Sequence, residues 1–174
     1  MIRSAVCIAA LLMTAPLPAQ VNCTANPSPC STGALTIRIT IGPAIQLAIA
    51  PATTMLTTPT AAHFLAGFAA TTGPTATVRA NAGWALAINA ATSVWSGTDT
   101  QSEPARTDKP AGDLRWATSS TGPFTPRSAS PVTVASGSAT AAATTTIFYQ
   151  TVYDWAVDTP GAYQLQLVLT ITSL

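Results

Sequence analysis

The chain has 174 residues, of which 48% are hydrophobic and only 7% are charged. Seven Lys and Arg residues against six Asp and Glu residues give a formal net charge of +1. This balance excludes a nucleic-acid binder with a basic surface, because phosphate neutralisation needs clustered Lys and Arg, and it excludes an acidic disordered tail. The single histidine, His63, leaves little for metal or acid–base chemistry.

Residues 1–19 have the pattern of a secretory signal peptide. Arg3 provides the positive start, Ala5 to Met13 is an apolar stretch, and Pro16 to Ala19 is a small-residue approach to a cleavage site. Nine apolar residues are too few to cross about 30 Å of hydrocarbon, so we expect no transmembrane anchor in the mature chain. We therefore expect a secreted protein that is extracellular, on the cell surface or periplasmic.

Residues 20–33 form a predicted N-terminal arm. Cys23 and Cys30 enclose a turn-rich loop with Pro27 and Pro29. In a secreted protein such a pair predicts a disulfide. A metal site would need further ligands, and the mature chain offers no third Cys and no second His. The bridge would fix the arm ahead of residues 34–174, which we predict to be one domain.

Apolar and polar residues alternate along much of residues 34–174, which indicates β-strands with one buried face. We expect an all-β fold, an antiparallel immunoglobulin-like β-sandwich of about eight strands. The clearest predicted strands are Ala34–Ile41, Ile45–Ile49, Trp84–Asn89 and Leu165–Thr172. Less clear ones are Thr75–Ala80, Leu114–Thr118, Val132–Ala135 and Thr144–Trp155.

Strand parity predicts several core side chains. Trp84 and Leu86 share one face of their strand, and Trp155 has the same parity as Ile147 and Tyr149. We therefore predict that these side chains are buried. Between these strands, residues 59–71 have mixed periods that allow a short helix or an irregular strand. We expect a strand or a loop there, in which His63 is a hydrogen-bonded structural residue.

Residues 94–110 are a polar loop that is too long for a simple hairpin turn. We predict that it is a binding loop, with Trp95 the best candidate for an exposed ring. Its acidic residues could lie in a solvated loop or hold calcium, although their spacing matches no EF-hand. The predicted loop residues are Trp95, Asp99, Glu103 and Asp108.

Four segments carry a resemblance to a known family. Thr77–Ala90 places a strand, an Asn/Gly turn and then Trp84-Ala85-Leu86, which resembles the first W-x-L motif of the WxL cell-surface domain. The resemblance extends to Pro160–Tyr163 with the following strand, to Asp113–Trp116, and to Tyr153–Trp155. It implies a β-rich secreted module that binds cell walls non-covalently, with Trp84, Leu86, Trp116, Trp155 and Tyr163 as motif or core residues.

The sequence shows no nucleophile elbow, nucleotide fingerprint or phosphate loop, so we expect no enzymatic activity and no cofactor. The favoured hypothesis is a secreted adhesion or structural module of the cell envelope, with an envelope component or like subunits as partners. One alternative is a self-assembling filament subunit that donates Ala34–Ile41 to a neighbour. Another is a carbohydrate-binding domain, which would need at least two exposed rings.

Overall fold

The computed structural model describes residues 37–101 and 103–174. The chain divides into two units, residues up to Thr40 and residues from Ile41 onward, and the second contains all the helices and strands described here. The predicted signal peptide, the arm and its disulfide between Cys23 and Cys30 lie outside the described residues. No helix in the described part is long and apolar enough to span a membrane.

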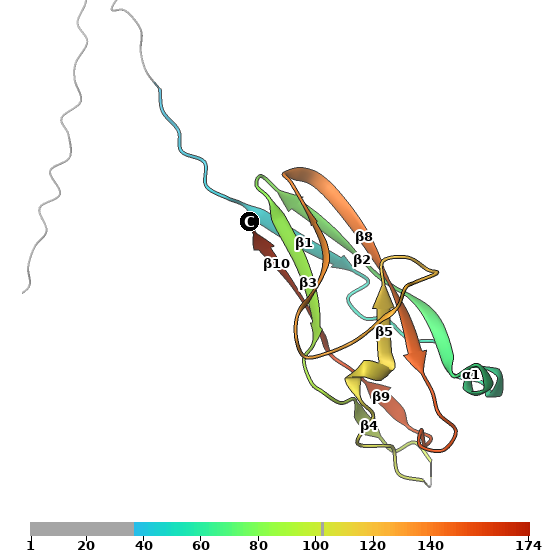
Figure 1. Cartoon of the computed structure of the whole chain (residues 1–174). Helices are drawn as coiled ribbons and strands as arrows, with labels where there is room; N and C mark the ends of the chain where they lie inside the picture. The colour runs from blue at the N-terminus through green and yellow to red at the C-terminus, as the bar shows by residue number, and fades with distance from the viewer. Residues whose placement is uncertain (1–36, 102) are drawn as a thin grey trace, which may run out of the picture. The chain divides into compact units, whose positions relative to one another are not determined.

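The second unit is all-β with antiparallel sheets, as the alternation predicts (Figure 1). A five-stranded sheet has the order β1-β2-β8-β5-β6, a three-stranded sheet has the order β10-β3-β7, and β4 pairs with β9. The strands are β1 (Ile45–Ala50), β2 (Phe68–Ala80), β3 (Trp84–Ala90), β4 (Ser96–Thr98), β5 (Leu114–Ala117), β6 (Thr125–Pro126), β7 (Val132–Gly137), β8 (Thr140–Val152), β9 (Ala162–Gln164) and β10 (Leu167–Ser173). Two short helices complete the unit, α1 (Ala61–Ala66) and the 3-10 helix η1 (Ala111–Asp113).

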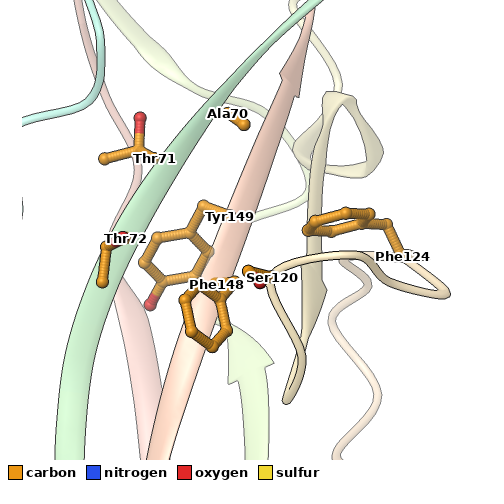
Figure 2. Close-up of a pocket in the computed structure, with 7 residues that line it drawn as sticks. All are labelled: Ala70, Thr71, Thr72, Ser120, Phe124, Phe148 and Tyr149. Carbon is orange, nitrogen blue, oxygen red and sulfur yellow. The ribbon is translucent and has the colours of Figure 1, made fainter.

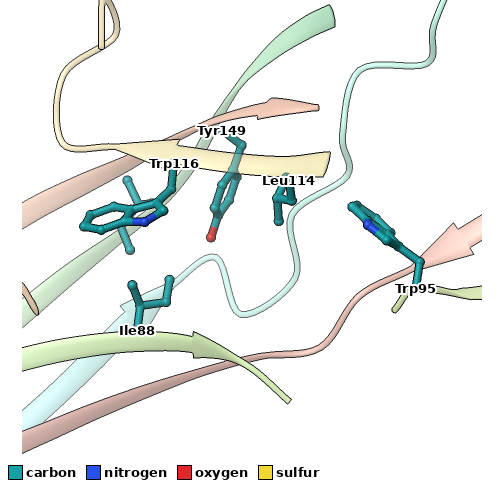
Figure 3. Close-up of a cluster of buried hydrophobic side chains, with 6 residues drawn as sticks. Ile88, Trp95, Leu114, Trp116 and Tyr149 are labelled. Carbon is teal, nitrogen blue, oxygen red and sulfur yellow. The ribbon is translucent and has the colours of Figure 1, made fainter. Parts of the chain in front are cut away.

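The two larger sheets meet through their apolar faces. One buried cluster joins Ile88 of β3 to side chains of β5 and β8, among them Trp116 and Tyr149 (Figure 3). A second joins Trp84 and Leu86 of β3 to small side chains of β2. The predicted burial of Trp84 and Leu86 is confirmed, and Trp116 is buried as well. These contacts make the sandwich.

The predicted strand Ala34–Ile41 is wrong for its described part, because residues 37–44 belong to no strand. The first strand begins only at Ile45, after Gly42 and Pro43. Asn81 holds this entry to β1, since its side chain accepts the N–H of Ala44 and donates to the carbonyl of Gly42. Alternation makes residues 37–41 suited to a strand, but a strand also needs a paired neighbour.

Residues 61–66 form a short helix, where the sequence predicts a strand or a loop. Thr60 precedes the helix in an extended conformation, and the Nδ1 of His63 accepts the Thr60 N–H at 3.1 Å. His63 is therefore a hydrogen-bonded structural residue, as expected. Gly67 ends the helix with φ of 77°, a left-handed conformation that glycine adopts without a Cβ clash.

Candidate functional site

The loop of residues 94–110 is folded against the sandwich. Trp95 is 4% exposed, so its predicted exposure is wrong. The indole Nε1–H donates to the carbonyl of Pro110 at 3.1 Å, and the Trp95 N–H donates to the carbonyl of Lys109. Because the two ends of the loop pair with each other, the ring turns inward and joins the cluster around Ile88 (Figure 3).

The predicted acidic residues of this loop lie apart and make different contacts. Asp99 accepts the N–H of Ala105 and so closes the loop, whereas the exposed Asp108 accepts the Nε–H of Arg106 at 2.7 Å. Glu103 is exposed. Within residues 37–101 and 103–174, no three His, Cys, Asp or Glu side chains gather closely enough to hold a metal ion. The structure does not bring the predicted loop acids together.

Beneath this loop lies a buried ion-pair network that the sequence prediction missed. Lys109 is only 2% exposed, and its Nζ lies 2.9 Å from Asp158 Oδ1 and 3.1 Å from Asp113 Oδ2. Arg106 contacts the same Asp158 oxygen at 3.0 Å. The Lys109 Nζ also donates to the carbonyl of Val152 at the end of β8. The network joins the loop to the turn after β8.

Asp158 is the acceptor at the centre of this network. Burial alone would raise the pKa of its carboxyl, but hydrogen bonds from Lys109, the Asp154 N–H and Arg106, with the charge of Lys109, outweigh burial and hold that pKa below its usual range. Asp158 Oδ2 accepts the Asp154 N–H at 2.9 Å, which closes residues 154–158 into a turn. The turn is thereby fixed to the core by charge.

The predicted motif residue Tyr163 supports the same loop from β9. Its hydroxyl accepts the N–H of Arg106 and donates to the carbonyl of Thr159. Gly161, just before β9, permits a close approach, because a Cβ built there would lie 2.7 Å from the Cβ of Ala105. Tyr163 is half-buried and packs against the core cluster around Ile88. Its role in this structure is to hold the loop.

Three aromatic side chains gather where α1 meets the turn after β8; Trp155 is exposed, and Phe64 and Tyr153 are half-buried. The ring centroid of Phe64 on α1 lies 4.6 Å from that of Trp155 and 5.4 Å from that of Tyr153. Figure 1 shows α1 beside the segments where β2 begins and β8 ends, and Phe68 of β2 pairs with Val152 of β8. We call Phe64, Tyr153 and Trp155 the aromatic platform.

Trp155 is 62% exposed, so its predicted burial is wrong. The error has a simple cause: β8 ends at Val152, and the alternation of faces ends with it. Tyr153 remains half-buried, with the Lys109 Nζ 5.3 Å from its ring centre. Burial raises the pKa of the Tyr153 hydroxyl, so the platform stays uncharged in the physiological range.

A separate pocket of about 140 Å³ lies between β2, β8 and the loop after β5 (Figure 2). Its lining is apolar or hydroxylated: Ala70, Thr71, Thr72, Ser120, Phe124, Phe148 and Tyr149. Burial raises the pKa of the Tyr149 hydroxyl to about 12. Pockets for small organic ligands are usually about 300 Å³ or larger, so this one is too small to be the main site.

One buried cation has no partner among the described residues. Arg127 is 3% exposed, its guanidinium carbon lies 4.8 Å from the ring centre of Trp116, and none of its side-chain N–H groups has a hydrogen-bond acceptor. Burial lowers the pKa of Arg127 to about 10. The stacking on Trp116 compensates only part of the cost of an unpaired buried charge.

No protein-family model matches the chain, and no curated protein matches it. The resemblance to the WxL domain therefore stays a prediction. Among the predicted site residues, the structure joins Tyr163 and the loop but separates the loop acids from one another. The residues that sequence reasoning missed are Phe64, Arg106, Lys109, Asp113 and Asp158. No local pattern indicated the contacts of Asp158, whose partners Lys109 and Arg106 lie 49 and 52 residues away in sequence.

Proposed function

We propose that the protein is a non-enzymatic, secreted adhesion module of the cell surface or envelope, and that the aromatic platform makes the contact. The observation that carries this proposal is Trp155, a large ring that is 62% exposed yet packed at a tilt against Phe64. Such a ring has little freedom to lose on binding, because its neighbours already hold it.

The surroundings of the platform favour an uncharged, partly apolar ligand. Leu65 of α1 and Val157 of the turn lie beside platform residues in sequence and are also exposed. The nearby charges of Lys109 and Asp158 are buried and neutralise each other. The exposed carboxylate of Asp154, between Tyr153 and Trp155, accepts the N–H of Ala156 and offers a hydrogen-bond acceptor beside the platform. A saccharide of the envelope fits this chemistry, because the C–H face of a sugar ring stacks on an aromatic face while its hydroxyls stay in water. Phe68, whose strand partner Val152 precedes Tyr153, is 42% exposed and supplies the second exposed ring that such a ligand needs.

The tryptophans allow a direct test. Trp84, Trp95 and Trp116 are 3%, 4% and 6% exposed, so Trp155 is the tryptophan that an added saccharide can reach. We expect envelope polysaccharide from the producing organism to change the intrinsic fluorescence in a saturable way. The Trp155→Ala variant should lose both the change and the binding.

The matched control is Met55→Ala, which removes an exposed apolar side chain from the segment between β1 and α1. It should bind as the unaltered protein does. Polysaccharide binding that survives in Trp155→Ala would contradict the platform as the contact surface, and a chain that binds no envelope polysaccharide would contradict the saccharide ligand.

A further inference from the structure

Among the described strands, only β3 is hydrogen-bonded to β10, so one edge of β10 is unpaired. β10 is an edge strand of the order β10-β3-β7, and the N–H of Leu174 donates to the carbonyl of Gly83 at the start of that ladder. Antiparallel pairs alternate between hydrogen-bonded and non-bonded pairs, so every second residue of β10 directs its N–H and carbonyl away from β3. These residues are Leu167, Leu169, Ile171 and Ser173.

On the side of the sandwich where β1 and β10 lie, the inward apolar side chains are only half-buried. The inward side chains of the middle strands are fully buried, for example Val78 of β2 and Leu86 of β3. Those of the two edge strands β1 and β10 are only half-buried, although the two strands lie near each other (Figure 1). The half-buried side chains are Leu47, Ile49, Leu167, Leu169 and Ile171. The β1–β10 side could therefore bury more apolar surface.

Residues 37–41 alternate apolar and polar side chains, as a strand that covered the β1–β10 side would. Ile37, Ile39 and Ile41 are 86%, 84% and 76% exposed, and they alternate with the polar Arg38 and Thr40. The segment belongs to no strand, so its backbone has no sheet partner. In an extended conformation its five residues would span about 17 Å, enough to run along most of β10.

We propose that residues 37–41 of one copy of the chain add as an antiparallel or parallel strand to the open edge of β10 in a second copy. The three isoleucines would lie on the inward face, at the same two-residue spacing as Leu167, Leu169 and Ile171. Strand addition satisfies the free backbone groups of both segments and buries the isoleucines in the same step.

Charge favours β10 over β1 as the acceptor. A strand added to β1 would place Arg38 on the outer face of the sheet that carries Arg79, which donates to Gln46 of β1. The outer face of β10 and β3 has no charged side chain, since its residues are Ala85, Ala87, Asn89, Val168, Thr170 and Thr172. Arg38 is accommodated there without a like charge beside it.

The contact joins two different surfaces, the 37–41 segment of one copy and β10 of the next. Such a head-to-tail contact does not close on itself unless the rotation between copies makes a ring, so it produces chains of subunits. The proposal is independent of the aromatic platform, which involves neither segment.

Sedimentation velocity of the full chain over a concentration series tests the association. Ile39→Asp puts a carboxylate on the inward face, and we expect the dissociation constant of the assembly to rise at least about tenfold. The matched control is Thr40→Asp, which adds the same charge on the outward side and should change it less than about twofold. Both positions lie outside every strand, and unchanged tryptophan fluorescence would verify that each variant is folded.

Hydrogen exchange locates the acceptor. On assembly, the amides of Leu167, Leu169 and Ile171 should become protected in the unaltered chain, and this protection should be absent in Ile39→Asp. A chain that stays monomeric, an assembly that Ile39→Asp leaves intact, or protection that appears at β1 or β7 in place of β10 would each overturn the proposal.

Discussion

Asp158 is the residue on which the turn that carries the aromatic platform depends most. It accepts from Lys109, from Arg106 and from the backbone of its own turn, and its side chain is only 6% exposed. Without its charge, Lys109 would be a buried cation with Asp113 as its remaining counter-ion. The turn that carries Trp155 is therefore held to the rest of the fold by ion pairs and hydrogen bonds of Asp158.

We expect Asp158→Asn to lower the free energy of unfolding by about 3 kcal/mol, because removing one partner leaves a buried charge incompletely compensated. Denaturant unfolding followed by fluorescence measures it. Asp108→Asn, at the exposed ion pair with Arg106, serves as the control and should leave stability unchanged within error. Equal effects of the two substitutions would refute the special position of Asp158.

The same carboxyl predicts a pH dependence. The pKa of Asp158 is lower in the folded chain than the usual value of about 3.9 in an unfolded one, so its contribution to stability is complete above that value. The contribution is lost as the pH falls below about 4 towards the folded pKa. Between pH 5 and pH 2, stability should fall less steeply in Asp158→Asn than in the unaltered chain. Parallel curves would argue against this assignment.

Trp95 and Trp155 should contribute very unequally to the stability of the fold. Trp95→Ala should cost about 3–5 kcal/mol, since it empties a buried site and removes a hydrogen bond to Pro110. Trp155→Ala should cost about 1 kcal/mol or less, because it removes mainly the contact with Phe64. Thermal unfolding of both variants is the measurement, and a larger loss in Trp155→Ala would reverse the assignment.

These two tryptophans also show why the burial of single residues could not be predicted from the sequence. Polar neighbours suggested that Trp95 is exposed, but the backbone pairing of Val94 with Pro110 turns its ring inward. Strand parity suggested that Trp155 is buried, but parity holds only as far as β8 does. In both cases a contact distant in sequence, or the end of an element, decides burial.

At the scale of elements, β2 and β8 form the longest ladder, and it contains an irregularity. The pairing shifts register between Thr72 and Thr75, where Gly73 and Pro74 have no partner in β8. A Cβ at Gly73 would lie 2.7 Å from the carbonyl oxygen of Ile147 and closer still to the ring of Tyr149. Glycine at this position lets the Tyr149 ring pack against the β2 backbone.

We expect Gly73→Ala to destabilise the fold by about 1–3 kcal/mol, because backbone and a buried ring must move to admit the methyl group. Gly42→Ala is the matched control: nothing lies within 4 Å of a Cβ there, and the change should stay below about 0.5 kcal/mol. Equilibrium unfolding in urea measures both. Indistinguishable variants would contradict the close packing at Gly73.

Alternation predicted most strands of the sandwich because one face of each meets the core. β3 shows this fully, with Trp84, Leu86 and Ile88 buried and Ala85 and Ala87 half-buried. The pattern failed for residues 37–41, where the side chains alternate but no strand of the described chain pairs with them. It also favoured a strand or a loop over the short helix that forms α1, because six residues are too few for a helical period to be recognised.

At the scale of the whole molecule, the all-β class could be predicted and the candidate site could not. Burial of one strand face is a local, periodic property that the order of residues records. The platform combines Phe64 with Tyr153 and Trp155, nearly ninety residues later, on a network that joins Lys109 to Asp158. Such sites depend on the folded path of the chain, which no local pattern contains.

The central claim is adhesion through the aromatic platform, and co-sedimentation with purified cell envelopes tests it most directly. We would use the Ile39→Asp chain, in which self-association is suppressed, with and without Trp155→Ala. The account predicts that Ile39→Asp alone stays in the supernatant, pellets when envelopes are added, and loses this pelleting when Trp155 is replaced. Equal pelleting of the single and double variants would contradict it.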